Sequence, residues 1–179
     1  NVKKDVMQKK GFLNNIISEF MMLEIAKNDI PTHFIQRISD REQLIKKAKI
    51  IPLEVVLRNV AAGSIVTKLA LEKGTVFESP IFELFYKDDA LNDPMINEDH
   101  AIKLLKIIDE TKLSKIKNFA FKINKILQKI FVNINLKLVD FKLEFGFDEN
   151  NNIILADEIS PDSCRLWDIQ TGESFDKDR

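Results

Sequence analysis

The residues of this 179-residue chain that could do chemistry are most concentrated in Leu138–Gly146, where apolar and charged side chains alternate. Because a β-strand has a period of two, we expect Asp140, Lys142 and Glu144 to share one face of a strand. The ordinary explanation is an antiparallel sheet whose polar face lies in water. The chemical explanation is a row of fixed charges that binds a charged substrate.

A second expected strand, Ile153–Ile159, carries another acidic residue, Asp157. A hairpin folded symmetrically about Asn150–Asn151 places Glu144 directly opposite Asp157. Like charges directly across a strand pair destabilise a sheet, whereas a divalent cation between two carboxylates would bind both of them. Oxygen ligands favour Mg²⁺, whose shell is usually completed by water and phosphate oxygens. We therefore predict a Mg²⁺ site at Glu144 and Asp157.

Two arginines extend the set of charged candidates. Arg165 lies in a polar segment that also holds the single Trp, and its guanidinium could bind a phosphate or a carboxylate through two N–H groups. The alternative is a salt bridge to Asp162 or Asp168. Arg58 precedes a turn of small residues that leads to Ser64, where free backbone N–H groups at a helix start could bind an anion. The alternative there is an N-cap serine and a surface arginine.

Helices and mainly antiparallel strands must position these side chains. Apolar spacing predicts a helix from about Phe12 that ends before Asn28, and a largely helical region over His100–Val132. Other expected elements are strands or extended segments at His33–Ile38, Lys46–Val60, Phe82–Tyr86, Lys137–Phe145 and Ile153–Ile159, a short helix at Ser64–Leu71, and a loop at Lys87–Asp99. This mixture predicts the α+β class.

Composition excludes several classes of protein. The formal net charge of -1 and the pI of about 6.2 provide no bulk field for nucleic acid or anionic membranes. No apolar run reaches the roughly 18 residues that span a bilayer. The single cysteine, Cys164, excludes an intramolecular disulfide and a cysteine-cluster metal site. We therefore expect a cytoplasmic protein with neither nucleic acid nor membrane as a partner.

Four segments, in order along essentially the whole chain, resemble signature blocks of the SAICAR synthetase family. They are IIPLEVVLRNVAAGS (50–64), KDDALNDPMINEDH (87–100), LVDFKLEFG (138–146) and LADEISPDSCRLWD (155–168). The resemblance implies a carbon–nitrogen ligase of de novo purine biosynthesis. Such an enzyme uses ATP to condense carboxyaminoimidazole ribonucleotide (CAIR) with L-aspartate, and it releases SAICAR, ADP and phosphate.

The resemblance also implies how ATP is bound. Glu144 and Asp157 match the pair that holds Mg²⁺ on the nucleotide, in agreement with the cross-strand argument. Lys87 is similar to a lysine near the ATP phosphates, and the stretch around Ile50 resembles the backbone hinge against the adenine.

Five further positions are implied to contact CAIR: Arg58, Ser64, Asp140, Lys142 and Arg165. Lys142 and Arg165 are the expected catalytic residues, because phosphoryl transfer is catalysed mostly by positioning and charge neutralisation. The implied fold is two-lobed and distantly kinase-like or ATP-grasp-like. Residues 1–51 are expected to be the remainder of a smaller ATP-binding lobe, and residues 52–179 a larger α+β lobe for substrate and metal. Both termini are expected to be truncated relative to the family.

Two other functions stay open. A small-molecule kinase on a related scaffold would use the same Mg²⁺–carboxylate pair, but it would transfer phosphate to a hydroxyl and need no aspartate. A non-catalytic binding or scaffold module derived from the synthetase would catalyse no reaction. Exposed apolar positions on the first helix are compatible with a homodimer and equally with contact to a further lobe.

Overall fold

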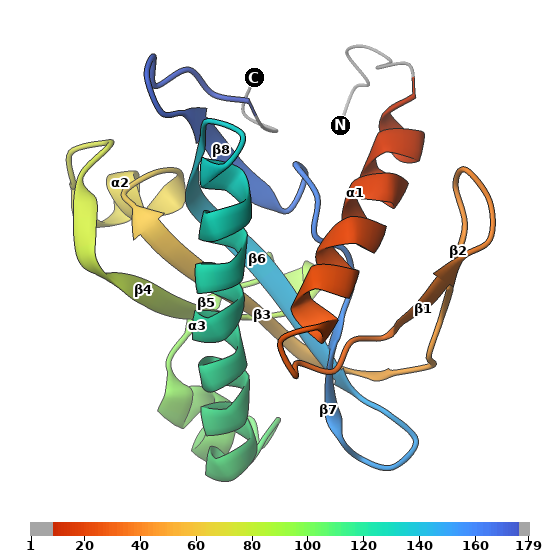
Figure 1. Ribbon diagram of the computed structural model, residues 1–179. Coiled ribbons are helices and arrows are strands. Elements are labelled where there is room, and N and C mark those ends of the chain that lie inside the picture. Colours follow the sequence, from red (N-terminus) through yellow and green to blue (C-terminus); the bar gives the residue numbers. More distant parts are fainter. Residues whose placement is uncertain (1–8, 176–179) are drawn as a thin grey trace.

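A curved antiparallel sheet carries two long helices on one face in the computed structural model, which describes residues 9–175 (Figure 1). The helices are α1 (Lys10–Ala26) and α3 (Glu110–Val132). The strand order is β5–β4–β3–β6–β7, and β8 also pairs with β6. The sheet strands are β3 (Lys49–Val60), β4 (Val76–Tyr86), β5 (Met95–Ile96), β6 (Leu136–Phe147), β7 (Ile153–Ala156) and β8 (Cys164–Asp168). The expected α+β class is confirmed.

The smaller elements join these layers. β1 (Phe34–Arg37) and β2 (Gln43–Ile45) form a separate two-stranded sheet. A short helix, α2 (Ser64–Leu69), follows β3, and a 3₁₀ turn, η1 (Asp89–Leu91), lies between β4 and β5. A single π-helical turn, η2 (His100–Leu104), precedes α3.

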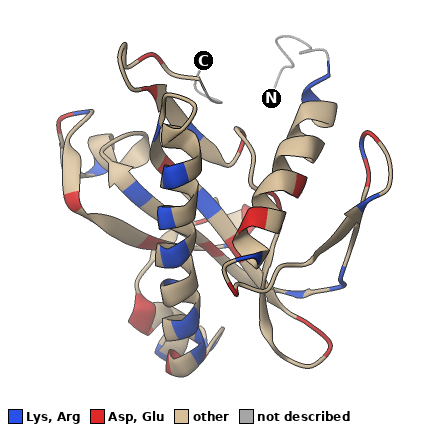
Figure 2. Ribbon diagram, in the orientation of Figure 1, with Lys and Arg blue, Asp and Glu red and all other residues tan. Residues whose placement is uncertain are grey.

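The amphipathic pattern of α3 determines which of its faces meets the sheet. Its first turn is capped by Asp109, whose carboxylate accepts a hydrogen bond of 2.8 Å from the backbone N–H of Lys112. Residues such as Ile116, Ile123 and Leu127 recur at helical spacing and are buried. Lysines lie at several of its other positions (Figure 2). Within residues 9–175, no helix is long and apolar enough to cross a membrane.

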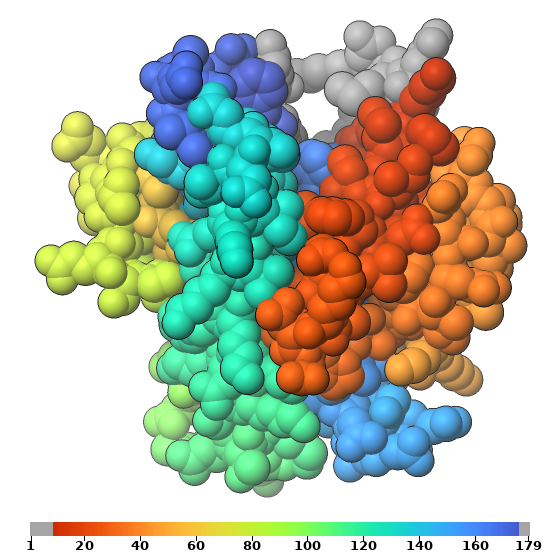
Figure 3. All heavy atoms as spheres, viewed as in Figure 1, coloured from red at the N-terminus to blue at the C-terminus, as the bar shows by residue number. Residues whose placement is uncertain are grey.

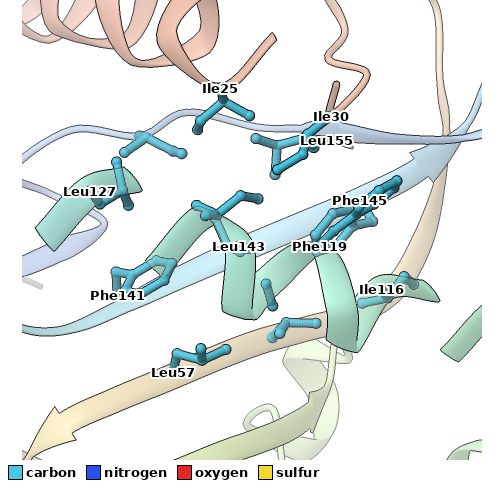
Figure 4. Packing of buried hydrophobic residues seen from close by; sticks show 14 of the residues in the cluster. Ile25, Ile30, Leu57, Ile116, Phe119, Leu127, Phe141, Leu143, Phe145 and Leu155 are labelled. Carbon is cyan, nitrogen blue, oxygen red and sulfur yellow. The ribbon is translucent and has the colours of Figure 1, made fainter. Parts of the chain in front are cut away.

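The main core lies between the helices and the sheet. Phe141, Leu143 and Phe145 alternate along β6 and pack against side chains from α1 and α3 (Figure 4). Burying each such side chain contributes about 1.5–3 kcal/mol before entropy is counted. The two helices lie side by side over this face (Figure 3). Polar residues that alternate with the core residues therefore point to the opposite face of the sheet.

Several expected boundaries differ from the structure. The polar segment around Arg165, whose composition is typical of a loop, contains a strand: Cys164–Asp168 forms β8 because it pairs with β6. β4 begins at Val76 rather than at Phe82. The helical region before Val132 is divided in two, since the chain leaves helical geometry between η2 and the Asp109 cap.

The hairpin register predicted from the sequence is wrong by one residue. Glu144 is paired with Ala156, not with Asp157. The loop between β6 and β7 is not the symmetric two-residue turn that the prediction assumed. Asn151 adopts a left-handed conformation with φ of 61°, and the Asp148 carboxylate accepts hydrogen bonds from two backbone N–H groups of the loop. A loop of odd length with a left-handed residue shifts the register by one position.

Candidate active site

Charged side chains of β3 and β6 share the sheet face that lies opposite the helices. In the antiparallel ladder Arg58 is paired with Asp140, and Glu54 is paired with Glu144. Paired residues point to the same face, and residues an even number apart on one strand do so as well. Asp140, Lys142 and Glu144 therefore lie on one face, as the alternation in the sequence predicted.

The first group on this face, the arginine cluster, consists of Arg58, Glu83, Asp140 and Arg165. Arg58 Nε donates to Glu83 Oε2 at 2.7 Å, and Arg58 Nη1 donates to Asp140 Oδ2 at 2.8 Å. Arg165 Nη1 lies 3.0 Å from both carboxylate oxygens of Asp140. Arg58 is only 4% exposed. Charges this buried need partners of opposite sign, and the cluster provides them in alternation.

Arg165 lies against the turn after β3. It pairs with Asp140 rather than with the alternatives Asp162 and Asp168. Its guanidinium lies against Gly63, where an added Cβ would be 2.8 Å from Arg165 Cζ. Next to Gly63 is a cavity of about 280 Å³ lined by Ala62, Gly63, Val66, Lys73, Trp167 and Ser174.

The helix start expected at Ser64 is present, but its cap is a different residue. Gly63 is the N-cap of α2, with φ of 63° and ψ of -141°, and Ser64 is the exposed first residue of the helix. The alternative of an N-cap serine is therefore wrong. The alternative of a surface arginine is wrong as well, because Arg58 is buried.

The second group, the lysine cluster, consists of Glu54, Lys87, Lys142, Glu144 and Asp157. Lys142 Nζ lies 2.7 Å from Glu144 Oε1, 3.1 Å from Glu54 Oε1 and 3.3 Å from Asp157 Oδ2. Lys87 Nζ lies 2.6 Å from Glu144 Oε1. Glu144 and Asp157 are thus brought together around one ammonium group, although they are not paired in the ladder.

Charge coupling keeps Glu144 and Lys142 ionised. Burial raises the pKa of Glu144, but the hydrogen bonds and charges of Lys142 and Lys87 outweigh it, so its pKa is lowered overall. Burial lowers the pKa of Lys142, but its hydrogen bond to Glu144 and the charges of Glu144, Asp157 and Glu54 raise it overall. Lys142 therefore acts as a fixed positive charge near neutral pH rather than as a proton acceptor.

The Glu144 and Asp157 carboxylates have the chemistry of a Mg²⁺ site. Both contact the same Lys142 Nζ, so their oxygens converge on one region. Asp157 follows the last paired residue of β7 in a left-handed conformation with φ of 59°, which is costly for a residue other than glycine. No group of three or more His, Cys, Asp or Glu residues within 9–175 could hold a metal. A pair of carboxylates suits an ion that phosphate oxygens and water would also coordinate.

Ile50 lies apart from both clusters, near the start of β3. It is 43% exposed and is paired with Gly146. β3 passes so close to Gly146 that an added Cβ would lie 3.1 Å from the Lys49 carbonyl oxygen. A neighbouring cavity of about 510 Å³ is lined by Lys46, Lys47, Lys49, Phe147, Asp148, Glu149 and Asn150.

Two acidic residues of these clusters were not singled out from the sequence. Glu54 could have been found, because it lies four residues before Arg58 and so shares its face in a strand. Glu83 gave no such signal. It lies 25 residues from Arg58 along the chain, and only the pairing of β3 with β4 brings the two together.

The arginine cluster and the lysine cluster place paired charges on one face of the sheet, and comparisons with known proteins give the family of the chain. The chain matches the SAICAR synthetase family over residues 1–179. A phosphoribosylaminoimidazole-succinocarboxamide synthase of Staphylococcus aureus is 53% identical over 176 residues, which are 98% of this chain and 75% of that protein. The chain belongs to the SAICAR synthetase family.

Solved structures agree with this assignment. The crystal structure of phosphoribosylaminoimidazole-succinocarboxamide synthase from Ehrlichia chaffeensis is 50% identical, with a TM-score of 0.94 over 98% of this chain and 75% of that chain. A SAICAR synthetase solved in complex with ADP is 46% identical, with a TM-score of 0.94 over 99% of this chain and 75% of that chain. The expected family and its ATP-dependent ligase function in purine biosynthesis are confirmed.

Proposed function

We propose that this chain condenses CAIR with L-aspartate at the expense of ATP, and that its two charged clusters divide the work. The observation that carries this proposal is their placement: Glu144 and Asp157 meet at Lys142 on the same sheet face as Arg58, Asp140 and Arg165. A nucleotide and an anionic second substrate could therefore be held side by side.

The lysine cluster is the proposed site for the ATP phosphates. Glu144 and Asp157 would hold Mg²⁺, which when bound neutralises phosphate charge. Lys87 and Lys142 place two ammonium groups beside Glu144, where they can contact phosphoryl oxygens. The exposed Ile50 at the start of β3 is the proposed contact for the adenine.

The arginine cluster is the proposed CAIR site. The Arg165 side chain is 17% exposed and Ser64 is exposed at the start of α2, so both can reach a ligand. Arg58 and Asp140 lie almost completely buried beside Arg165. Only the small exposed part of each side chain can contact CAIR. The main effect of Arg58 and Asp140 is therefore to orient Arg165.

The chemistry requires activation, because a carboxylate is a poor electrophile. A CAIR carboxylate oxygen attacks the γ-phosphorus of ATP, and the bond to ADP breaks. The aspartate amine then attacks the carbonyl carbon of the resulting acyl phosphate. The carbon–oxygen bond breaks, phosphate leaves, and the amine loses a proton as the amide forms. Fixed positive groups such as Lys142 and Arg165 assist by positioning and charge neutralisation.

Isotope transfer tests this proposal directly. The purified enzyme is supplied with ATP, Mg²⁺, CAIR and ¹⁵N-labelled L-aspartate, and the products are separated by mass spectrometry. We expect SAICAR that carries ¹⁵N in its new amide. A phosphorylated product without ¹⁵N would instead identify the small-molecule kinase described above, and would contradict the proposal.

Three further features are part of the proposal. Residues 1–51 belong to an ATP-binding lobe and residues 52–179 to a lobe for substrate and metal. The enzyme acts in the cytoplasm. Exposed apolar residues of α1, among them Phe20 and Leu23, contribute to a homodimer. Sedimentation at several concentrations tests the dimer, and substitution of Phe20 by Ser should shift it toward monomer.

A further inference from the structure

Glu83 is a buried carboxylate that the chemistry above does not use. It is 8% exposed and lies on β4, beyond the strands that carry the other charged residues. Within residues 9–175, the carboxylates in ion pairs with the guanidinium groups of Arg58 and Arg165 are those of Glu83 and Asp140. Glu83 therefore balances the buried charge, and it does so from the side remote from Arg165.

The contacts of Arg58 show how Glu83 could act at a distance. Its Nε is bound to Glu83 Oε2, while its Nη1 is bound to Asp140 Oδ2 and, at 3.2 Å, to the Ala62 carbonyl oxygen. Because a guanidinium is planar and rigid, fixing the Nε side sets the direction in which Nη1 points. Asp140 in turn presents both of its oxygens to Arg165 Nη1.

We infer that Glu83 is a positioning residue for substrate binding, acting through Arg58 and Asp140 on the guanidinium of Arg165. The inference rests on the proposed function, in which Arg165 binds CAIR. Arg165 is the member of this chain of contacts that lies against Gly63, beside the cavity of about 280 Å³. Loss of the Glu83 charge leaves Arg58 to compete with Arg165 for Asp140, and the orientation of Arg165 is relaxed.

The test compares Glu83→Gln with a matched control, Glu78→Gln. Glu78 is an exposed residue of the same strand, so its substitution removes the same charge without touching the cluster. KM for CAIR, KM for ATP and kcat are measured for the wild-type enzyme and both variants, together with their melting temperatures. We expect KM for CAIR to rise at least about tenfold in Glu83→Gln, because small displacements of positioning groups have effects of this size or larger.

A rise in KM for CAIR without a matching rise in KM for ATP distinguishes a positioning role of Glu83 from a purely structural one. KM for ATP is expected to stay within about twofold of wild type, since the lysine cluster shares no contact with Glu83. An unchanged KM for CAIR in folded Glu83→Gln, or equal rises in both KM values, would overturn the inference. If Glu83→Gln does not fold, the same two KM values are measured for Glu83→Asp, which keeps the charge on a shorter side chain. The same criterion then applies. Absence of SAICAR formation by the wild-type enzyme would instead contradict the proposed function.

Discussion

Glu54 on β3 stands directly opposite Glu144 on β6, and the ammonium group of Lys142 lies between them, 3.1 Å from Glu54 Oε1 and 2.7 Å from Glu144 Oε1. Like charges in this arrangement repel each other across a strand pair. Lys142 converts the repulsion into two attractive contacts, and it adds a third to Asp157. The site therefore holds its carboxylates close together by means of its own side chains.

Substitution of Lys142 by Met should lower the stability of the folded enzyme. Added Mg²⁺ should restore part of that stability. Three carboxylates would then lack their shared cation. We expect the free energy of unfolding to fall by about 2 kcal/mol. This is less than the roughly 3–5 kcal/mol lost when a fully buried ion pair is broken, because the Lys142 side chain is 29% exposed. Thermal unfolding with and without Mg²⁺ checks this, and added Mg²⁺ should raise the melting temperature more in the variant than in wild type. Lys137→Met, at an exposed position of the same strand, is the control. Equal stability of the two variants would contradict the role given to Lys142.

Substitution of Glu144 by Ala should abolish turnover while the fold persists. Glu144 is the carboxylate that contacts both Lys87 and Lys142, and it is one of the two proposed Mg²⁺ ligands. Lys142 keeps Glu54 and Asp157 as partners in the variant, so the sheet retains a paired charge there. We expect kcat to fall at least about 100-fold. Steady-state kinetics and circular dichroism check the two halves of this prediction. A folded variant with full activity would remove Glu144 from the site.

Substitution of Gly63 by Ala should weaken CAIR binding through Arg165. An added Cβ would lie 2.8 Å from Arg165 Cζ, and Gly63 also has a positive φ of 63° that favours glycine. Gly74→Ala separates these two effects, since Gly74 has φ of 94° but no atom within 4 Å of an added Cβ. Both variants should therefore lose stability. Only Gly63→Ala should also raise KM for CAIR, by about tenfold or more. Similar KM values for the two variants would show that Arg165 tolerates the displacement.

Strand periodicity predicted the shared face of Asp140, Lys142 and Glu144, because alternation is a local property of the chain. The partner across the hairpin could not be predicted in the same way. Its register depends on Asn151 adopting a left-handed conformation, and asparagine does so only in some turns. The prediction that Glu144 and Asp157 come together holds in space, but Lys142 brings them together and the ladder does not.

The rest of the two clusters depends on long-range pairing. Glu83 meets Arg58 only because β4 pairs with β3, and Arg165 meets Asp140 only because Cys164–Asp168 becomes a strand beside β6. Neither pairing leaves a periodic signal in the sequence. The sequence motif around Arg165 nevertheless predicts a functional role for this segment.

The Asp148 carboxylate should make the β6–β7 loop sensitive to acid. Hydrogen bonds from the Asn152 and Asn150 backbone and the Asn152 side chain, together with the charge of Lys46, lower the pKa of Asp148 below its ordinary value of 3.8. A lowered pKa means that the folded state favours the ionised form. Its stabilising effect is therefore complete above about pH 3.8 and is lost as the pH falls through the lower folded-state pKa.

Melting temperatures of Asp148→Ala and wild type, measured from pH 7 to pH 2.5, check this dependence. The variant should melt at a lower temperature at pH 7, and the difference should shrink below about pH 3.8. Asp148→Asn keeps a hydrogen-bond acceptor but no titratable group, so its difference from Asp148→Ala should not depend on pH. A constant difference between wild type and Asp148→Ala across the range would contradict the assignment.

The central claim is that the two charged clusters serve one ligation that couples ATP to aspartate. The most direct test is ADP release by the enzyme with ATP, Mg²⁺ and CAIR, measured with and without L-aspartate. We predict ADP release that requires aspartate and matches SAICAR formation mole for mole. ADP release that is equally fast without aspartate, or its absence with all substrates present, would contradict the claim.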